Sequence, residues 1–243
     1  INEDISFPNS MIDKITPRPD KSILKILKED GIKDLKEDDH YMNIFSNGEE
    51  IEYLVIEDNF KNGKIPLDKV GVIYTDRLTV DKIEKMKVST CLNPVHTTLA
   101  IFGNLLGYKL INEEMKDETL YKLIKHVSYD EGLKVSEDPL IIHPKDFLDE
   151  VINVRLSNPY LPDSPQRIIM DTSMKMPIRF GETLKAYLNK GIDLNELTYI
   201  PLVIAGWFRY LIGVDDNNQK IELISDPNLD YLLTYTSKIK LGQ

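Results

Sequence analysis

The chain lacks the glycine patterns with which many enzymes bind nucleotides. No two of its 12 glycines are separated by a single residue, so the G-x-G-x-x-G dinucleotide fingerprint is absent. A P-loop and the H-E-x-x-H zinc motif are missing as well. The sequence therefore gives no indication that this stretch of chain itself holds a dinucleotide or a nucleoside triphosphate.

Cysteine and histidine are scarce. Cys91 is the only cysteine, so no disulfide can form within the chain, which fits a reducing cytosol and predicts a cytoplasmic protein. We interpret Cys91 as a small buried apolar residue, with a nucleophile as the alternative. The histidines, His40, His96, His126 and His143, are scattered, and no clustered Cys/His spacing occurs. The sequence therefore predicts no metal site.

Long apolar runs and an excess of positive charge are also absent. The longest strongly apolar run, near residues 200–208, is too short to span a bilayer and contains Pro201. No signal peptide is visible. The net charge of -10 argues against a nucleic-acid-binding surface, although it is compatible with a local basic pocket for an anionic metabolite. We expect neither nucleic acid nor a membrane as a partner.

The composition that remains is that of a globular protein. A chain of 243 residues with 42% hydrophobic and 29% charged residues can bury a sizeable core as one large domain or two small ones. It begins at Ile1 rather than Met, and Phe7-Pro8-Asn9 follows soon after. We interpret it as a piece of a longer protein.

Secondary-structure signals favour a mainly α fold with a small β element. Short helices are predicted at 10–15 and 22–27, strands at 51–57 and 71–74, and a turn at Asn62-Gly63. Helices then follow one another, at 93–106, 116–127, 144–156, 182–188, 201–212 and 226–235. The segment 201–212 is apolar nearly all round, which predicts that it lies at the centre of the core.

The most informative stretch is residues 85–107. Asn93-Pro94 is a strong helix start, because Asn caps free N–H groups and Pro suits the first helical position. His96 lies three residues after Asn93, so both side chains can point the same way. Lys87 precedes them on a predicted loop. An amine, an amide and an imidazole at a helix N-terminus suit chemistry on a carbonyl or an alcohol. The alternative is that Asn93 is only a helix cap, His96 only a first-turn residue and Lys87 a solvated lysine.

Six segments, in order over almost the whole chain, resemble the polyol-specific long-chain dehydrogenase family, which includes mannitol 2-dehydrogenase, fructuronate reductase and tagaturonate reductase. They are FPNSMIDKITP at 7–17, VIEDNF at 55–60, the 87–96 stretch, RLSNP at 155–159, RIIMDTSMK at 167–175 and AGWFRYLIGVDD at 205–216. The resemblance implies a multi-helical C-terminal substrate domain, similar to the C-terminal domain of 6-phosphogluconate dehydrogenase. It also implies that NAD is bound mainly by an N-terminal nucleotide-binding domain of the same protein. Residues 1–22 would connect to that domain, and 23–243 would bind the substrate.

In this family the reaction is metal-independent hydride transfer with a lysine as general base, and Lys87 matches that lysine. Its amine has to lose a proton near neutral pH, which requires a pKa lowered by burial or by nearby positive charge. Glu84 matches an acid that opens a proton path to solvent; the alternative is a surface carboxylate paired with a lysine. Asn93 matches an amide that polarises the carbonyl, and His96 an imidazole that contacts substrate in its neutral form.

One departure from the family pattern lies in this stretch. The usual spacing is K-x4-N-x2-H, whereas five residues separate Lys87 from Asn93 here. Lys85 is further off still, so Lys87 is the better match. The extra residue predicts a bulge before the helix that begins at Asn93.

Asp13, Arg167 and Lys175 match residues that contact the substrate. The alternative for Asp13 is a cap or an ion-pair partner for Lys14. For Arg167 it is a helix-end ion pair, and for Lys175 a solvated surface position. An arginine and a lysine can bind either a sugar-acid carboxylate or polyol hydroxyls. The wording of residues 91–94, CLNP, is more similar to the mannonate-oxidising branch of the family. Mannitol 2-dehydrogenase and tagaturonate reductase are alternatives, and a helical interaction module without catalysis is an alternative of another class.

Overall fold

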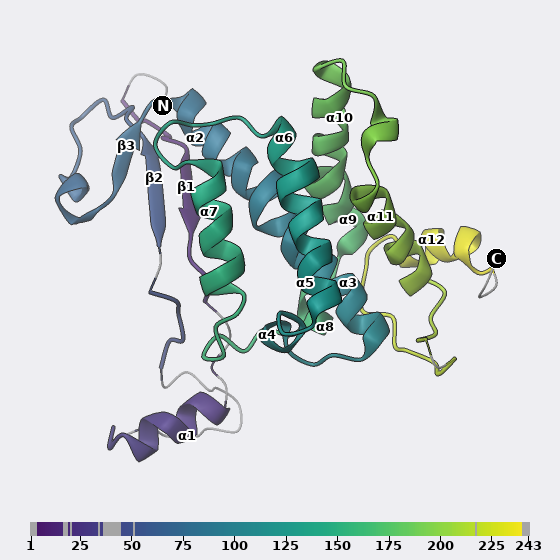
Figure 1. Ribbon diagram of the computed structural model, residues 1–243. Coiled ribbons are helices and arrows are strands. Elements are labelled where there is room, and N and C mark those ends of the chain that lie inside the picture. Colours follow the sequence, from purple (N-terminus) through teal and green to yellow (C-terminus); the bar gives the residue numbers. More distant parts are fainter. Residues whose placement is uncertain are drawn as a thin grey trace. The chain divides into compact units, whose positions relative to one another are not determined.

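The computed structural model of the chain describes residues 4–16, 19, 21–33, 35, 45–50, 52–216 and 218–239. This part is mostly helical and contains one small sheet, which confirms the predicted fold class (Figure 1). It divides into two compact units, the first from residues 1–81 with 158–162 and the second from 82–157 with 163–243. His40 and Ile51, at the start of a predicted strand, lie outside the described residues.

The sheet of the first unit has the order β1-β2-β3, with strands Ser10–Asp13, Tyr53–Glu57 and Ile73–Thr75. β1 and β2 are antiparallel, whereas β2 and β3 are parallel. The helix predicted at 10–15 is wrong. Met11 and Asp13 are buried while Ser10 and Ile12 are exposed, which is the two-residue period of a strand rather than that of a helix.

The rest of the first unit follows the predictions. The helix α1 spans Lys21–Glu29, and Gly31 follows it with a φ of +81°, a left-handed conformation that suits glycine. Gly63, in the predicted turn, also has a φ of +81°. The 3-10 helix η1, Leu67–Val70, precedes β3. The strands predicted at 51–57 and 71–74 are β2 and β3.

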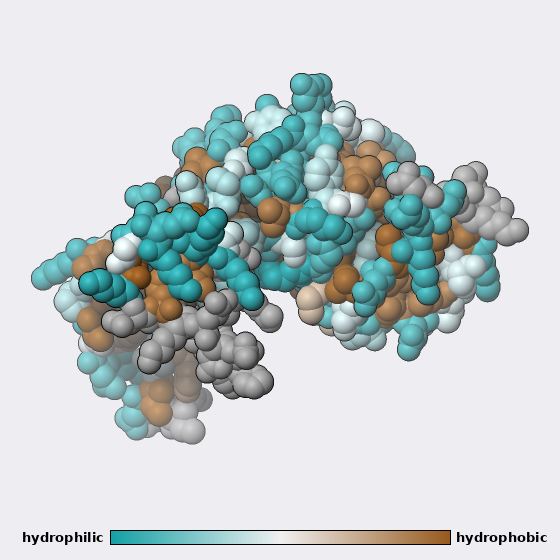
Figure 2. All heavy atoms as spheres, turned by 90° about the horizontal axis from the view of Figure 1, so that it is seen from below, coloured by the Kyte–Doolittle hydropathy of each residue, from teal (hydrophilic) through white to brown (hydrophobic). Residues whose placement is uncertain are grey.

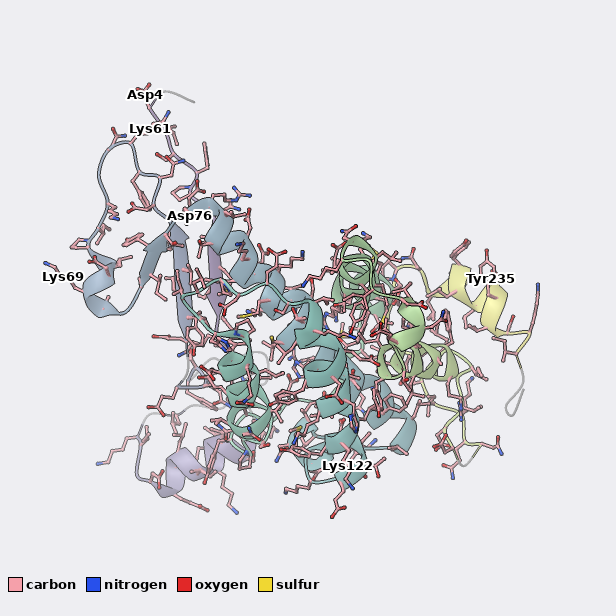
Figure 3. All side chains as sticks on the ribbon, turned by 45° about the horizontal axis from the view of Figure 1, so that its top comes forward. Asp4, Lys61, Lys69, Asp76, Lys122 and Tyr235 are labelled. Carbon is pink, nitrogen blue, oxygen red and sulfur yellow. The ribbon has the colours of Figure 1, made fainter. Side chains whose placement is uncertain are left out.

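The helix α2, Arg77–Lys85, begins in the first unit and continues into the second. Asp76, labelled at its start in Figure 3, accepts hydrogen bonds from the Thr79 backbone N–H at 3.0 Å and from the Thr79 hydroxyl at 2.8 Å. These bonds lower the pKa of Asp76 because they favour the charged carboxylate, with the Thr79 hydroxyl as the largest cause. Asp76 is therefore the N-cap of α2.

Helices make up the second unit. In chain order they are η2 (Met86–Cys91), α3 (Asn93–Leu106), α4 (Ile111–Glu114), α5 (Glu118–Lys125), η3 (His126–Gly132), α6 (Leu133–Val135), α7 (Pro144–Glu150), η4 (Val151–Arg155), α8 (Pro165–Ile168), α9 (Thr172–Met176), η5 (Pro177–Gly181), α10 (Glu182–Asn189), η6 (Leu194–Glu196), α11 (Tyr199–Tyr210) and α12 (Leu229–Thr236). Lys122 on α5 and Tyr235 on α12 are labelled in Figure 3, and both side chains are exposed.

Four of these elements, η2, η3, η4 and η5, are π-helical. A π-turn holds one residue more than an α-turn, and such turns are frequent at functional sites. The predicted helices 116–127 and 144–156 run from α5 into η3 and from α7 into η4. The apolar spacing therefore located these helices, but it did not reveal the change of helix type within them.

The core of the second unit lies between α3 and α11, with Ile101, Val203 and Trp207 among its buried residues. The prediction that segment 201–212 is central in the core is only partly right, because Leu202 is 46% exposed and Phe208 is 42% exposed. One side of α11 is therefore buried and another is open. Figure 2 shows hydrophobic atoms at the surface among hydrophilic ones. Within the described residues, no helix is long and apolar enough to cross a membrane.

Candidate active site

The start of α3 carries two of the predicted site residues, Asn93 and His96. The helix has Leu92 as its N-cap residue, and no side chain caps it. The predicted capping role of Asn93 is therefore wrong. The reason is that η2 runs directly into α3: the Leu92 N–H donates to Lys87 O at 3.1 Å, and the His96 N–H donates to Leu92 O at 3.0 Å. Within the described residues the Asn93 side chain makes no hydrogen bond.

Lys87 lies in η2 and not in the predicted loop. The Leu92-to-Lys87 hydrogen bond spans five residues and closes a π-turn. Because this turn holds one residue more than an α-turn, the extra residue between Lys87 and Asn93 is absorbed within the helical path. The predicted bulge is confirmed. Lys87 is half-buried, whereas Glu84, near the end of α2, is exposed.

His96 faces a buried carboxylate, Asp163, just before α8. His96 Nε2 lies 3.4 Å from Asp163 Oδ2, within ion-pair range but without the geometry of a hydrogen bond. Arg167 donates from Nε to Asp163 Oδ1 at 2.6 Å and from Nη2 to Oδ2, so the two planar groups form a bidentate pair. Arg167 therefore makes the helix-end ion pair that was the alternative to substrate contact, and this pair places it beside His96.

Burial controls the charge of His96. It lowers the pKa of the imidazole, and the nearby charges of Arg179 and Arg167 lower it further, while Asp163 opposes this change. For Asp163, burial raises the pKa, but contacts with His96 and Arg167 outweigh burial and hold it far below its usual range. His96 is therefore neutral beside an ionised Asp163, and its Nε2 is buried without a hydrogen-bond partner among the described residues.

Arg179, in η5, reaches the same end of α3. Its Nη1 donates to the Thr97 hydroxyl at 2.5 Å, and that hydroxyl donates to Asn93 O at 2.8 Å. Burial lowers the pKa of Arg179 to about 10. Sequence reasoning missed this residue, although it lies four residues after Lys175, a spacing that puts both side chains on one helix face.

Lys175, in α9, is half-buried rather than solvated as the alternative had it. Its amine donates to Ile168 O at 2.9 Å and also to Met170 O. Burial lowers the pKa of Lys175, and the positive charges of Arg179 and Arg167 lower it further, whereas Asp171 and Asp226 raise it. Lys175 is thus held beside both arginines.

The structure gathers Asn93, His96, Arg167 and Lys175 around the start of α3, and it adds Arg179. Asp13 belongs to the first unit, where it ends β1 with a buried side chain. Its alternative partner, Lys14, forms an ion pair with Glu52 at 2.8 Å. The roles of Asp13, Glu84 and Lys87, and those of the gathered residues in binding or catalysis, stay predictions.

Two further sequence-based interpretations concern sulfur and metal. Cys91 is fully buried, and burial raises the pKa of its thiol to about 12, so the thiol stays protonated. This supports the interpretation of Cys91 as a small buried residue. Among the described residues, no group of three or more His, Cys, Asp or Glu side chains is arranged to hold a metal ion.

Residues 79–240 match the family described as the mannitol dehydrogenase C-terminal domain, and the chain belongs to this family. Two similar solved structures are a D-sorbitol dehydrogenase in substrate-free form (28% identity, TM-score 0.79, 93% of this chain and 44% of that one) and a Pseudomonas fluorescens mannitol 2-dehydrogenase in a ternary complex with NAD and D-mannitol (29% identity, TM-score 0.77, 96% and 44%). The predicted family is confirmed.

Curated relatives fall into the same group. D-mannonate oxidoreductase of Thermotoga maritima is 54% identical over 100% of this chain and 46% of its own length. Mannitol dehydrogenase 2 of Saccharomyces cerevisiae is 33% identical over 93% of this chain and 42% of its own length. The chain thus spans about half the length of the curated relatives it matches.

Proposed function

We propose that this chain is the substrate-binding and catalytic C-terminal domain of an NAD-dependent dehydrogenase that interconverts D-mannonate and D-fructuronate. The observation that carries the proposal is the group of polar side chains at the start of α3. Arg167 is paired with the ionised carboxylate of Asp163 beside neutral His96, Lys175 lies near Asp171 and Asp226, and Arg179 has no carboxylate partner among the described residues. In a protein with a net charge of -10, the unpaired guanidinium of Arg179 suits an anionic sugar acid.

The side chains suit the handling of a hydroxyl and a carbonyl. In the oxidation direction, the Lys87 amine removes the proton from the reacting hydroxyl, and the Asn93 amide donates a hydrogen bond to the oxygen as its negative charge develops. The neutral imidazole of His96 binds a neighbouring hydroxyl of the substrate. In reduction, Lys87 returns the proton. Glu84, exposed near the end of α2, exchanges that proton with solvent.

The cofactor is assigned to another part of the protein. This chain has no glycine-rich phosphate-binding turn, so its residues do not suit the pyrophosphate of a dinucleotide. We propose that an N-terminal nucleotide-binding domain holds NAD, that residues 1–22 lead from it, and that residues 23–243 form the substrate domain. NAD supplies the hydride acceptor. The mannitol 2-dehydrogenase named above, which was solved with NAD, supports the choice of cofactor.

Two alternatives are less well supported. Mannitol 2-dehydrogenase or tagaturonate reductase would use the same hydroxyl chemistry, but the 54% identity favours the mannonate enzyme. A helical interaction module without catalysis is less well supported because the matching family and relatives are named as dehydrogenases and an oxidoreductase.

The test is Lys87→Ala in the full-length protein, with Lys85→Ala as the matched control. Lys85 lies two residues away, is exposed and pairs with Glu137 at 3.3 Å. Loss of a general base lowers kcat by about 10²- to 10⁴-fold, so Lys87→Ala should show this loss while Lys85→Ala stays near the wild-type rate. Circular dichroism checks that both variants are folded. Near-normal turnover of fructuronate by Lys87→Ala would contradict the proposed role of Lys87.

A further inference from the structure

Arg179 differs from Arg167, the other arginine of the site, in having no anionic partner among the described residues. Arg167 is paired with Asp163 through two hydrogen bonds. Arg179 has a single hydrogen bond among the described residues, to the neutral Thr97 hydroxyl, and no carboxylate there forms an ion pair with it. Most of its five N–H donors are therefore left for something else.

This arrangement is costly unless an anion completes it. A charge that is partly withdrawn from water and not paired destabilises the folded protein. The fall in the pKa of Arg179, which burial alone accounts for, expresses that cost. Unpaired charges of this kind are concentrated at functional sites, where a ligand supplies the missing charge.

The position of Arg179 relates it to the proposed chemistry. Through the Thr97 hydroxyl it lies two hydrogen bonds from the backbone of Asn93. The Lys175 amine donates to backbone carbonyls and has Asp171 and Asp226 nearby, and the Arg167 guanidinium is occupied by Asp163. Of the three cations, Arg179 is the one with a guanidinium fork that no carboxylate occupies among the described residues.

We propose that Arg179 binds the carboxylate of the sugar-acid substrate and thereby sets the preference for an acid over a neutral polyol. This inference rests on the proposed function. A planar guanidinium matches a carboxylate with two parallel hydrogen bonds, a geometry that a hydroxyl does not reproduce. Arg167, which the sequence put forward for this task, instead orients His96 through Asp163.

The first test compares D-fructuronate with D-fructose as substrates of the full-length enzyme, in the wild type and in Arg179→Gln and Arg179→Lys. Loss of a charged hydrogen bond to the carboxylate should lower kcat/KM for fructuronate about 10- to 150-fold more than for fructose in Arg179→Gln. Arg179→Lys, which keeps the charge but not the fork, should lose less. An equal loss on both substrates would overturn the assignment, because it would show that Arg179 only positions Thr97 and Asn93.

The second test separates this inference from the proposed function. Because an unpaired buried charge is removed, Arg179→Gln should melt at the same temperature as the wild type or higher, whereas loss of a purely structural arginine lowers the melting temperature. D-mannonate should raise the melting temperature of the wild type and not that of Arg179→Gln, with D-mannitol as the neutral control. If the wild type turns over neither D-fructuronate nor D-fructose, the proposed function fails. The effect of D-mannonate on the melting temperature then decides by itself whether Arg179 binds the carboxylate. A D-mannonate shift that survives in Arg179→Gln overturns the inference.

Discussion

Glu114, at the end of α4, should make the stability of the protein fall as the pH rises. Its side chain is fully buried, and neither carboxyl oxygen has a hydrogen-bond partner among the described residues. It packs against Gly103 of α3 so closely that a Cβ on Gly103 would lie 2.2 Å from Glu114 Oε1. Burial raises the pKa of Glu114 from 4.5 to about 9.

The direction and size of the effect follow from this pKa. Between pH 4.5 and about 9 the unfolded chain loses the Glu114 proton while the folded protein keeps it. The folded state binds more protons in that window, so the free energy of unfolding falls as the pH rises and becomes level above it. One pKa unit corresponds to about 1.4 kcal/mol, so the loss between pH 5 and 8 is about 4 kcal/mol.

The assay is urea denaturation of the wild type and of Glu114→Gln at pH 5, 6, 7 and 8. Glutamine keeps the shape and cannot ionise, so the variant should gain about 1.4 kcal/mol on the wild type per pH unit. Glu113→Gln is the matched control, because Glu113 is the exposed neighbour on α4 and should follow the wild type. A constant difference between Glu114→Gln and the wild type at all four pH values would refute the reasoning, because it would mean that Glu114 titrates alike in both states.

Two further changes test how α11 is held. Buried Glu131 accepts hydrogen bonds from the backbone N–H groups of Thr198, Tyr199 and Ile200 at 2.6, 2.8 and 2.6 Å. Glu131→Ala should therefore lower the free energy of unfolding, measured by urea denaturation, by about 2–4 kcal/mol. A loss below about 1 kcal/mol would show that water replaces the Glu131 carboxylate as the cap of α11. A Cβ on Gly206 would lie 2.8 Å from the Phe102 ring, so Gly206→Ala should lower the free energy of unfolding by about 1–3 kcal/mol. At Gly181 the nearest atom to an added Cβ lies at 3.9 Å, so Gly181→Ala should be tolerated. Equal melting temperatures for the two variants would contradict this reasoning.

Local signals in the sequence located the helices well. Asn93-Pro94 predicted the start of α3, and apolar spacing predicted its end at Leu106, where Gly107 follows with a φ of +81°. The strand β1 escaped prediction because four residues hold only two periods of alternation, and its partner residues in β2 lie 40 to 46 positions away in sequence. Pairing over such a distance is not encoded locally.

The sequence pointed to several residues that lie together in the structure, but not to their pairing, and their roles stay predictions. The resemblance pointed to Asn93, His96, Arg167 and Lys175, which the structure brings together. Arg167 is paired because Asp163 accepts both of its hydrogen bonds, whereas Arg179 has no carboxylate partner among the described residues. No sequence motif had indicated Asp163. The π-turn that absorbs the extra residue before Asn93 resembles an ordinary helix in apolar spacing, so only the anomalous spacing hinted at it.

The most direct test of the central claim is NAD reduction with D-mannonate by the full-length protein and, side by side, by the chain of residues 1–243 alone. Hydride transfer requires the nicotinamide to be held against the reacting carbon. The account predicts turnover of D-mannonate by the full-length protein, slower turnover of D-mannitol, and none of either by the chain alone. Dehydrogenase activity of the isolated chain would contradict the assignment of the cofactor to another domain, and a preference for D-mannitol would contradict the assignment of a sugar acid as substrate.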